Sequence, residues 1–273
     1  MHLHEILTPS FRSIGEQLGL DISIDNGKLN ISDPGHRFDP LPFWQQRLSN
    51  ASSFCRACVA KGYLTRAQMD QAAHRYRLGR SKDDAVIYWQ IDCEERIHDG
   101  KLMWYGPDCH RLKNRRATWV SFLLKRHYQF PDDVPASHCL FGLHLVDNSR
   151  SVAVVEAEKT AVILSAYYPQ HVWLAAGGLG EVQADKFRPL RGQRIILFPD
   201  TDPTGQAYKH WYDAAQEVMR QPFWEGSPPI RVSPILELNA TPDQKARKID
   251  LVDYLFESRT LTLPNASDSA VKP

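Results

Sequence analysis

Two apolar stretches constrain the fold more than any other feature of this sequence, because each ends abruptly in carboxylates and then continues with a helical pattern. The first, VAVVEAEKTAVI, covers Val152–Ile163, and the second, RIILFPDTDPTGQA, covers Arg194–Ala207. Runs rich in β-branched residues and without polar alternation are typical of buried parallel strands, which are covered on both faces. The sequence therefore predicts an α/β domain in which strands and helices alternate.

The carboxylates that follow these runs are Glu156, Asp200 and Asp202. Side chains at the carboxyl ends of parallel strands lie in the crevice where open α/β sheets bind ligands. Since strand residues alternate with period two, Asp200 and Asp202 are expected to face the same side. Oxygen ligands of this kind suit Mg²⁺ or Mn²⁺ together with a phosphate group. The pattern predicts a divalent-metal site, although acids at strand ends also cap helices without any further role.

Composition limits the classes of protein that are compatible with the chain. Its 273 residues are enough for one large or two modest domains. The formal net charge is only +1, so a role in nucleic-acid binding has to depend on a local basic patch. No apolar run is long enough for a membrane span, and the first residues do not resemble a secretory signal. We therefore expect a cytoplasmic protein that does not bind a membrane.

The five cysteines, an odd number, argue against a disulfide framework in a chain of this length. Cys55 and Cys58 have the spacing of half a zinc site, which Cys109 and His110 could complete. The second pair is adjacent in sequence, however, and lacks the intervening residues of most zinc sites. Reduced cysteines are the favoured interpretation, and structural zinc is the alternative.

A polar break at residues 147–151 predicts a boundary between two regions. Residues 1–150 have an α+β pattern, residues 151–258 have the pattern of a Rossmann-like α/β domain with a mostly parallel sheet, and residues 259–273 form a polar tail that we expect to be mobile. The elements expected in the first region are a helix over 2–20, a hairpin around Asp25–Lys28, helices over Phe43–Ala60 and Thr65–Tyr76, and strands Ala85–Ile91 and Lys101–Tyr105 joined at Asp99-Gly100. In the second region, besides the two runs above, we expect strands at His171–Ala175 and Ile230–Ile235 and helices at Gln206–Arg220 and Leu251–Glu257.

Three acidic motifs resemble the Toprim domain of bacterial primases, topoisomerases and related nucleases. They are Glu156-Ala-Glu-Lys159-Thr-Ala161, Asp200-Thr-Asp202-Pro-Thr-Gly205-Gln-Ala207 and Asp250-Leu-Val-Asp253-Tyr254. Upstream, Tyr76–Arg80, Val86–Ile91, Gly100–Tyr105 and Leu140–Leu143 follow the order of the amino-terminal subdomain of primase catalytic cores. The resemblance implies a primase-core-like region before a Toprim domain, as in small primase-like proteins of bacterial mobile elements. It also implies a metal site formed by Glu156, Asp200, Asp202 and Asp250.

Two departures from the Toprim pattern bear on the number of metals. The usual Gly after the first Glu is Ala157, and an acid that often stands four positions after that Glu is Thr160. The chain has neither a primase-type zinc ribbon nor a helicase-type phosphate loop. A primase of this kind would take its template from another protein, such as a helicase.

The chemistry expected of such a site is phosphoryl or nucleotidyl transfer, for which carboxylate-bound metal ions neutralise charge and position the attacking oxygen. The candidate catalytic residues are Glu156, as a general base, and Lys159, as a contact for a phosphate near the helix amino terminus. A solvated helix face is the alternative for Lys159. Primer synthesis is the favoured activity, a Toprim nuclease is the second, and a non-catalytic protein that binds nucleic acid or a partner is the third.

A basic stretch, His110–Arg116, is the candidate surface for single-stranded DNA or RNA. The cations that we expect to contact phosphates are Arg80, Lys113, Arg115 and Arg116, with Trp104, Tyr105 and Trp119 as nearby aromatic residues. The alternative is a solvated loop over core aromatic residues. Nucleotides and a single strand, with a helicase or another replication protein, are the expected partners.

Overall fold

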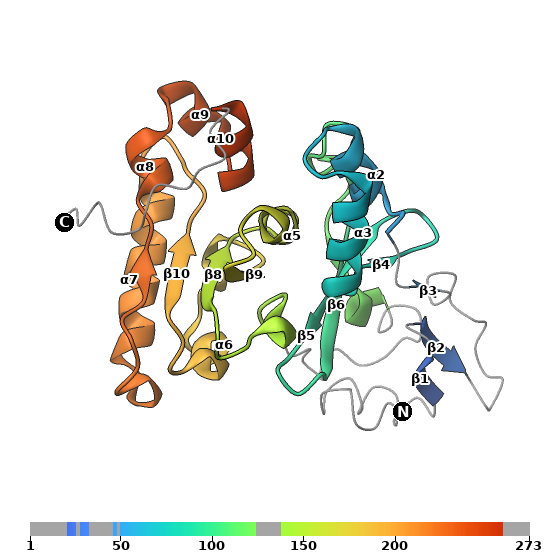
Figure 1. Ribbon diagram of the computed structural model, residues 1–273, viewed down its shortest axis with the longest axis horizontal. Helices are drawn as coiled ribbons and strands as arrows, with labels where there is room; N and C mark the ends of the chain where they lie inside the picture. Colours follow the sequence, from blue (N-terminus) through green and yellow to red (C-terminus); the bar gives the residue numbers. More distant parts are fainter. Residues whose placement is uncertain (1–20, 26–27, 33–45, 48–49, 124–137, 259–273) are drawn as a thin grey trace. The chain divides into compact units, whose positions relative to one another are not determined.

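The computed structural model describes residues 21–25, 28–32, 46–47, 50–123 and 138–258. They belong to two compact units, residues 1–145 and 146–273 (Figure 1). The helix predicted over residues 2–20 and the polar tail predicted from residue 259 lie outside the described residues. Within those ranges, no helix has both the length and the apolar character that crossing a membrane requires.

A small antiparallel sheet, in strand order β1-β2-β3, opens the first unit. Strand β1 (Asp21–Asp25) pairs with β2 (Lys28–Ser32), and Ile22 stands opposite Ile31. Strand β3 (Gln46–Arg47) pairs with β2. The predicted hairpin is therefore confirmed, and the two residues at its tip lie outside the described part of the chain.

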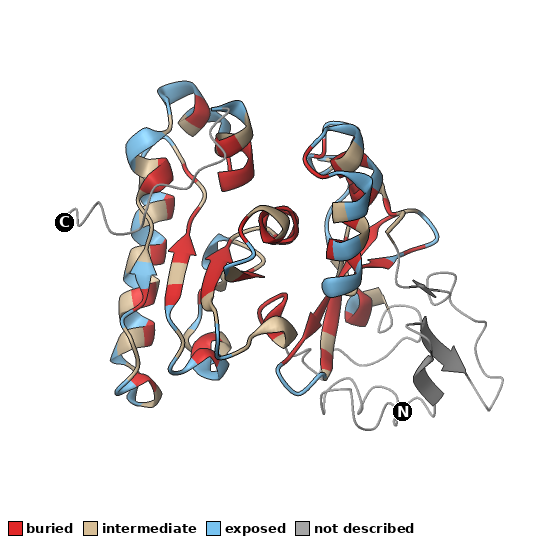
Figure 2. Ribbon diagram, in the orientation of Figure 1, coloured by how far each residue is buried: buried red, intermediate tan, exposed pale blue. Residues whose placement is uncertain are grey.

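A second antiparallel sheet, in strand order β4-β5-β6-β7, forms the core of this unit. Its strands are β4 (Gly79–Arg80), β5 (Val86–Ile91), β6 (Ile97–Met103) and β7 (Thr118–Trp119). Every residue of β5 is buried, as expected for an inner strand rich in β-branched and aromatic residues (Figure 2). The predicted strand pair corresponds to β5 and β6.

The turn between β5 and β6 differs from the prediction. Asp99 and Gly100 lie inside β6, and the chain instead reverses at residues 92–96. The carboxylate of Asp92 accepts hydrogen bonds from the backbone N–H groups of Glu94, at 2.9 Å, and Arg96, at 3.0 Å, and so organises the turn. Gly100 is needed for packing, since a Cβ atom there would lie 2.7 Å from the Trp89 ring.

Helices α2 and α3 precede this sheet in the chain. Helix α2 (Ser53–Ala60) begins ten residues later than predicted, because the Ser52 hydroxyl caps it by accepting from the N–H of Cys55 at 3.4 Å. Helix α3 (Arg66–Arg75) agrees with the prediction: Thr65 and Gln68 form a reciprocal capping box at its start. A 3₁₀ turn, η2 (Leu143–Leu145), ends the unit.

The second unit has a four-stranded sheet in the order β11-β10-β8-β9, and every pair of neighbours is parallel. The strands are β8 (Ser151–Val155), β9 (His171–Ala175), β10 (Ile195–Phe198) and β11 (Arg231–Val232). The apolar run Val152–Val155 is fully buried in β8. The parallel sheet predicted from the apolar runs is therefore confirmed, although β11 is shorter than the predicted strand.

Helix α5 packs against β8 and β9, whereas α7 packs against β11 and lies beyond β10 in the view of Figure 1. The helices are α5 (Glu158–Tyr167), α6 (Ala184–Phe187), α7 (Gln206–Arg220), α8 (Ile235–Asn239), α9 (Pro242–Arg247) and α10 (Leu251–Glu257), with 3₁₀ turns η3 (Leu179–Glu181), η4 (Arg188–Leu190) and η5 (Pro222–Trp224). Helices α7 and α10 have the predicted bounds. The sequence reading missed α6, α8 and α9, which are only four to six residues long.

Candidate functional site

The candidate site is built at the carboxyl ends of β8 and β10. These adjacent strands are parallel, and their last residues, Val155 and Phe198, stand side by side. Glu156 follows β8 directly, and Asp200 follows β10 after one proline. Two carboxylates therefore leave the sheet at the same edge, where open α/β sheets form ligand sites.

Asp250 joins this edge from a third element, since it caps the amino terminus of α10. The backbone N–H of Thr201 donates to the carbonyl of Ile249 at 3.2 Å. This bond joins the loop after β10 to the residue that precedes Asp250. The structure thus brings together three of the four predicted metal ligands: Glu156, Asp200 and Asp250.

The carboxyl groups of this cluster influence one another. Burial, followed by the carboxylates of Asp250 and Glu156, raises the pKa of Asp200 well above its ordinary value, whereas Lys159 opposes the rise. For Asp250, burial also favours a higher pKa, but the Lys159 ammonium, the N–H of Asp253 and the Thr160 hydroxyl together lower it. Acids whose environments drive their pKa values apart are typical of functional sites.

Lys159 lies inside the acidic cluster. Its side chain is 9% exposed, and its Nζ atom lies 3.0 Å from Oδ2 of Asp250 and 3.9 Å from Oδ1 of Asp253. Thr160, the next residue of α5, donates its hydroxyl to the same Oδ2 atom at 2.8 Å. The alternative of a solvated helix face for Lys159 is therefore wrong, because the ammonium is buried against carboxylates.

Asp202 has a different environment from Asp200. Its carboxylate accepts hydrogen bonds from the N–H groups of Thr204, at 2.8 Å, and Ala207, at 2.6 Å, and so caps the start of α7 from outside the N-cap position, which is Gly205. Asp200 and Asp202 do not alternate as strand residues, contrary to the prediction, because β10 ends at Phe198, before both acids. A metal-binding role for Asp202 stays a prediction, and its observed bonds are those of a helix cap.

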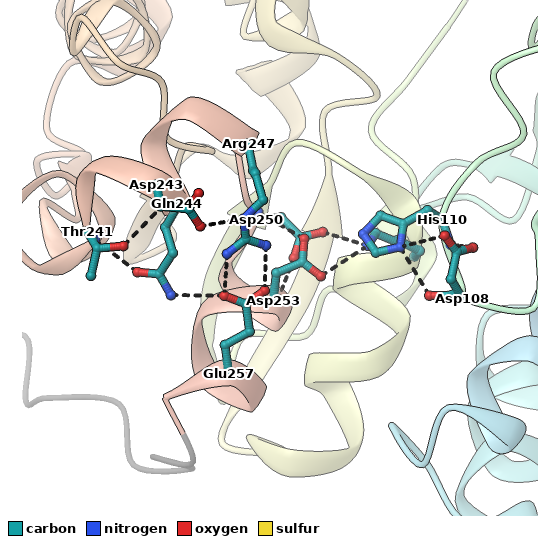
Figure 3. Close-up of polar contacts among 10 residues, drawn as sticks. Asp108, His110, Thr241, Asp243, Gln244, Arg247, Asp250, Asp253 and Glu257 are labelled. Carbon is teal, nitrogen blue, oxygen red and sulfur yellow. Dashed lines mark hydrogen bonds and ion pairs between the residues drawn. The ribbon is translucent and has the colours of Figure 1, made fainter.

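Side-chain contacts join α9 to α10, the helix whose N-cap is Asp250 (Figure 3). Both terminal nitrogens of Arg247 donate to Glu257 at 2.7 Å, and its Nε atom donates to Asp243 at 3.0 Å. The amide of Gln244 reaches Glu257 at 3.1 Å. A two-point contact between a guanidinium and a carboxylate fixes orientation as well as distance. The Arg247–Glu257 contact joins the end of α9 to the last turn of α10, and Asp250 stands at the opposite end of α10, as its N-cap.

The glycine loop after β9 is bonded to the same edge of the sheet. The N–H of Gly177 donates to the carbonyl of Glu156 at 2.9 Å, and the N–H of Ala176 donates to that of Val155 at 2.9 Å. Gly177 has a φ of 97°, a backbone angle that residues other than glycine rarely adopt. The loop therefore fixes the backbone of Glu156.

The donor set has the chemistry that Mg²⁺ or Mn²⁺ requires, because its groups are carboxylates and the repulsion among them favours a cation. Among the described residues, however, no three His, Cys, Asp or Glu side chains are already arranged around a metal position. Glu156 and Asp200, both half-buried, are the residues of this edge that could hold an ion. Asp250 is already bonded to Lys159 and Thr160.

Sequence reasoning missed the roles of Thr160 and Asp253. Thr160 stood out only as a departure from a family pattern, yet its hydroxyl holds Asp250. Asp253 forms a capping box with Asp250: each side chain accepts from the backbone N–H of the other. The spacing of a cap residue and an acid three positions later was the available signal.

The basic stretch of the first unit is exposed at Arg111, Lys113, Arg115 and Arg116. Arg115 lies 4.8 Å from the centre of the Trp104 ring and 3.0 Å from Asp83. Arg80 donates to Asp84 at 2.8 Å. Two of the four predicted phosphate contacts, Arg80 and Arg115, thus have acidic neighbours already, and Lys113 and Arg116 are the better candidates.

All five cysteines lie in the described part of the chain, and none of them forms a disulfide bond there. Cys55, Cys58 and Cys109 are fully buried in the first unit. The Cys109 thiol beside Cys58, and then burial, raise the pKa of the Cys58 thiol. Among the described residues, no three His, Cys, Asp or Glu side chains are grouped around a metal position, and structural zinc stays a prediction.

The fold and the site define a mixed α/β protein with a parallel sheet and carboxylates at its carboxyl edge. Residues 53–201 match the family profile described as a domain of unknown function, DUF6371. Since this match covers more than half of the chain, the protein belongs to that family. No curated protein matches the chain.

Two solved structures are similar to the chain. The first is the primase fragment of the bacteriophage T7 primase-helicase protein, with 16% identity, coverage of 80% of this chain and 81% of that chain, and a TM-score of 0.45. The second is a structure of the bacteriophage T7 lagging-strand DNA polymerase interacting with primase domains of two gp4 subunits bound to an RNA/DNA hybrid and dTTP. It has 14% identity, coverage of 70% of this chain and 83% of that chain, and a TM-score of 0.43.

Proposed function

We propose that this protein carries out metal-dependent phosphoryl transfer on nucleic acid, with primer synthesis on a single strand as the reaction. One observation carries the proposal: Glu156 and Asp200 follow adjacent parallel strands and meet Asp250 at the same sheet edge. Carboxylates at this position suit an ion that binds phosphates. The resemblance of the three acidic motifs to Toprim sequences agrees with it.

Mg²⁺ or Mn²⁺ would be held by Glu156 and Asp200, and it would neutralise the charge that develops on a transferring phosphoryl group. Glu156, which is half-buried and directly follows β8, would accept a proton from a 3′-hydroxyl group. Its backbone is fixed by the Gly177 loop, so the carboxylate needs little reorganisation. Thr160 and Lys159 fix Asp250 beside it.

The nucleic acid would be held by the exposed cations of the first unit. Lys113 and Arg116 are the proposed phosphate contacts, and Arg115 would contribute less because it already contacts Asp83 and Trp104. Phosphate contacts of this kind give binding without strong sequence preference. A helicase or another replication protein would be the partner that supplies the template.

The test uses the full chain with Mn²⁺, nucleotides and single-stranded DNA. In one arm the nucleotides are labelled, and in the other the DNA is labelled at its 5′ end. Primer synthesis predicts labelled products that require a template in the first arm and an unchanged strand in the second. Shortening of the strand would instead support the nuclease alternative, in which the same acids direct water.

Glu156→Gln is the decisive variant, because the amide keeps the volume but neither accepts a proton nor neutralises a cation. We expect activity to fall by about 10²-fold or more. Glu217→Gln, an exposed acid of α7, is the matched control and should leave activity unchanged. Equal activity of the Glu156→Gln and wild-type proteins would refute the role of Glu156.

A non-catalytic nucleic-acid-binding protein is the second candidate, and two observations favour it. Asp250 is neutralised by Lys159, and Asp202 is engaged in capping α7. This candidate predicts single-strand binding with neither longer nor shorter products in either arm.

A further inference from the structure

The acidic cluster already contains one positive charge, which belongs to the protein itself. Lys159 is the second residue of α5, and its side chain is almost wholly buried, with 9% exposed. A buried ammonium is costly unless carboxylates surround it. Here its partners are Asp250 at 3.0 Å and Asp253 at 3.9 Å.

The oxygens of Asp250 are already engaged. Its Oδ2 atom accepts from the Thr160 hydroxyl at 2.8 Å and contacts the Lys159 ammonium, while Oδ1 accepts from the N–H of Asp253 at 2.9 Å. A metal ion that bound Oδ2 of Asp250 would have to displace the ammonium. The Oδ2 atom of Asp250 thus has two partners without a metal, and Oδ1 has one, so three of the roughly four acceptor sites of this carboxylate are occupied.

Besides burial, Asp250, Glu156 and Asp253 raise the pKa of Asp200, and the Lys159 ammonium opposes this rise. Lys159 is therefore the counter-charge of Asp250, Asp253 and Asp200, and Glu156 adds a fourth carboxylate that acts on Asp200. A single divalent ion added at Glu156 and Asp200 brings the cluster close to neutrality, whereas a second divalent ion would have to compete with Lys159 for the same oxygens.

We propose that the ammonium of Lys159 takes the place of one divalent cation in this cluster, so that the wild-type site holds a single Mg²⁺ or Mn²⁺ at Glu156 and Asp200. The number of bound ions rests on the proposed function, whereas the role of Lys159 as an internal cation does not. Lys159 is a positioning residue: it holds Asp250 and excludes a metal from that side of the cluster.

The test counts Mn²⁺ ions bound to the full chain at neutral pH by electron paramagnetic resonance, without any substrate. Lys159→Gln keeps a hydrogen-bond donor and removes the charge, so it should bind one further Mn²⁺ ion, or the same number about tenfold more tightly. Lys159→Arg keeps the charge and should bind Mn²⁺ as the wild type does. Lys186→Gln is the matched control, since Lys186 is similarly buried, with 10% exposed, and pairs with Glu181 outside the cluster.

The outcomes separate this inference from the proposed function. If the wild type binds no Mn²⁺ and the Lys159→Gln variant binds one ion, the role of Lys159 is supported and metal-dependent chemistry is refuted. One ion in both proteins, at equal affinity and lost in Glu156→Gln, would support the metal site and refute the role of Lys159. A Lys159→Gln protein that stays unfolded with and without Mn²⁺ would also overturn the inference, because no metal would then replace the ammonium.

Discussion

Asp202 offers a sharp test of how the loop after β10 is built. Its carboxylate accepts from the N–H groups of Thr204 and Ala207 and so caps α7, a helix of 15 residues. Loss of a helix cap of this kind costs about 1 kcal/mol, within a range of roughly 0.5–2 kcal/mol. Removing the negative charge near the helix amino terminus adds on the order of 0.5 kcal/mol. Asp202→Ala should therefore lower the free energy of unfolding by about 1.5 kcal/mol.

The pH dependence of this effect has a defined sign. Burial favours a higher pKa for Asp202, but the hydrogen bonds from Thr204, Ala207 and Gln206 outweigh it and lower the pKa to about 2, from an unfolded value of 3.8. A carboxyl with a lowered pKa stabilises the fold above its unfolded pKa, and this contribution is lost as the pH falls through the folded value. The difference between wild type and Asp202→Ala should thus be constant from pH 7 to about 5 and should shrink between about pH 4 and pH 2.

Urea unfolding followed by circular dichroism measures the loss of stability, and hydrogen exchange at the first amides of α7 locates it. Asp213→Ala, at an exposed position of the same helix, is the control and should change stability by less than about 0.5 kcal/mol. An Asp202→Ala protein with wild-type stability and unchanged exchange would refute the capping argument. If that variant also lost Mn²⁺ binding, Asp202 would be a metal ligand and not a cap.

Two further predictions concern the first unit. Replacing Lys113, Arg115 and Arg116 with Ala should weaken single-strand binding. It should also reduce the slope of log affinity against log salt by about two, since each lost phosphate contact removes roughly 0.7. An unchanged slope in a fluorescence anisotropy titration would show that the stretch is a solvated loop. Gly100→Ala should destabilise the protein by about 1–3 kcal/mol in urea unfolding, because its Cβ atom would lie 2.7 Å from the Trp89 ring. Gly180→Ala, which has no neighbouring atom within 4 Å, serves as the control, and equal stability of the two variants would contradict the packing argument.

Much of the second unit could be predicted from the sequence because its signals are local and strong. The β-branched run of β8 is buried on both faces, and such a run is compatible with few alternatives. Helix α7 begins after Gly205 and ends at Arg220, as its pattern predicts. By contrast, α8 and α9 have five and six residues, too few for a periodic pattern to be recognised.

Two predictions for the first unit were wrong, the position of the turn between β5 and β6 and the start of α2. They have a common cause, which is that one residue type serves several structural roles. Asp99-Gly100 has the composition of a turn, yet Gly100 lies within β6 because the Trp89 ring occupies the space of a side chain. The turn is instead organised by Asp92, whose side-chain bonds depend on the fold of residues 92–96. The same ambiguity explains why Ser52, inside a predicted helix, is its cap.

The candidate site could be predicted only in part. The apolar runs predict parallel strands, whose carboxyl ends share one edge of the sheet, and Glu156 and Asp200 follow two neighbouring strands there. The side-chain directions do not follow, since Lys159 could have been exposed and Asp202 could have faced the cluster. Tertiary contacts decide both: Asp250 from α10 attracts the ammonium, and the start of α7 engages Asp202.

The central claim is that Glu156 and Asp200 hold a divalent cation at the carboxyl edge of the parallel sheet. Crystals of the wild-type protein soaked in Mn²⁺ and measured for anomalous scattering test it most directly. The predicted result is a single ion at about 2.1 Å from carboxylate oxygens of both residues, with Lys159 still bound to Asp250. An ion bound elsewhere, or no ion at a saturating Mn²⁺ concentration, would contradict the claim.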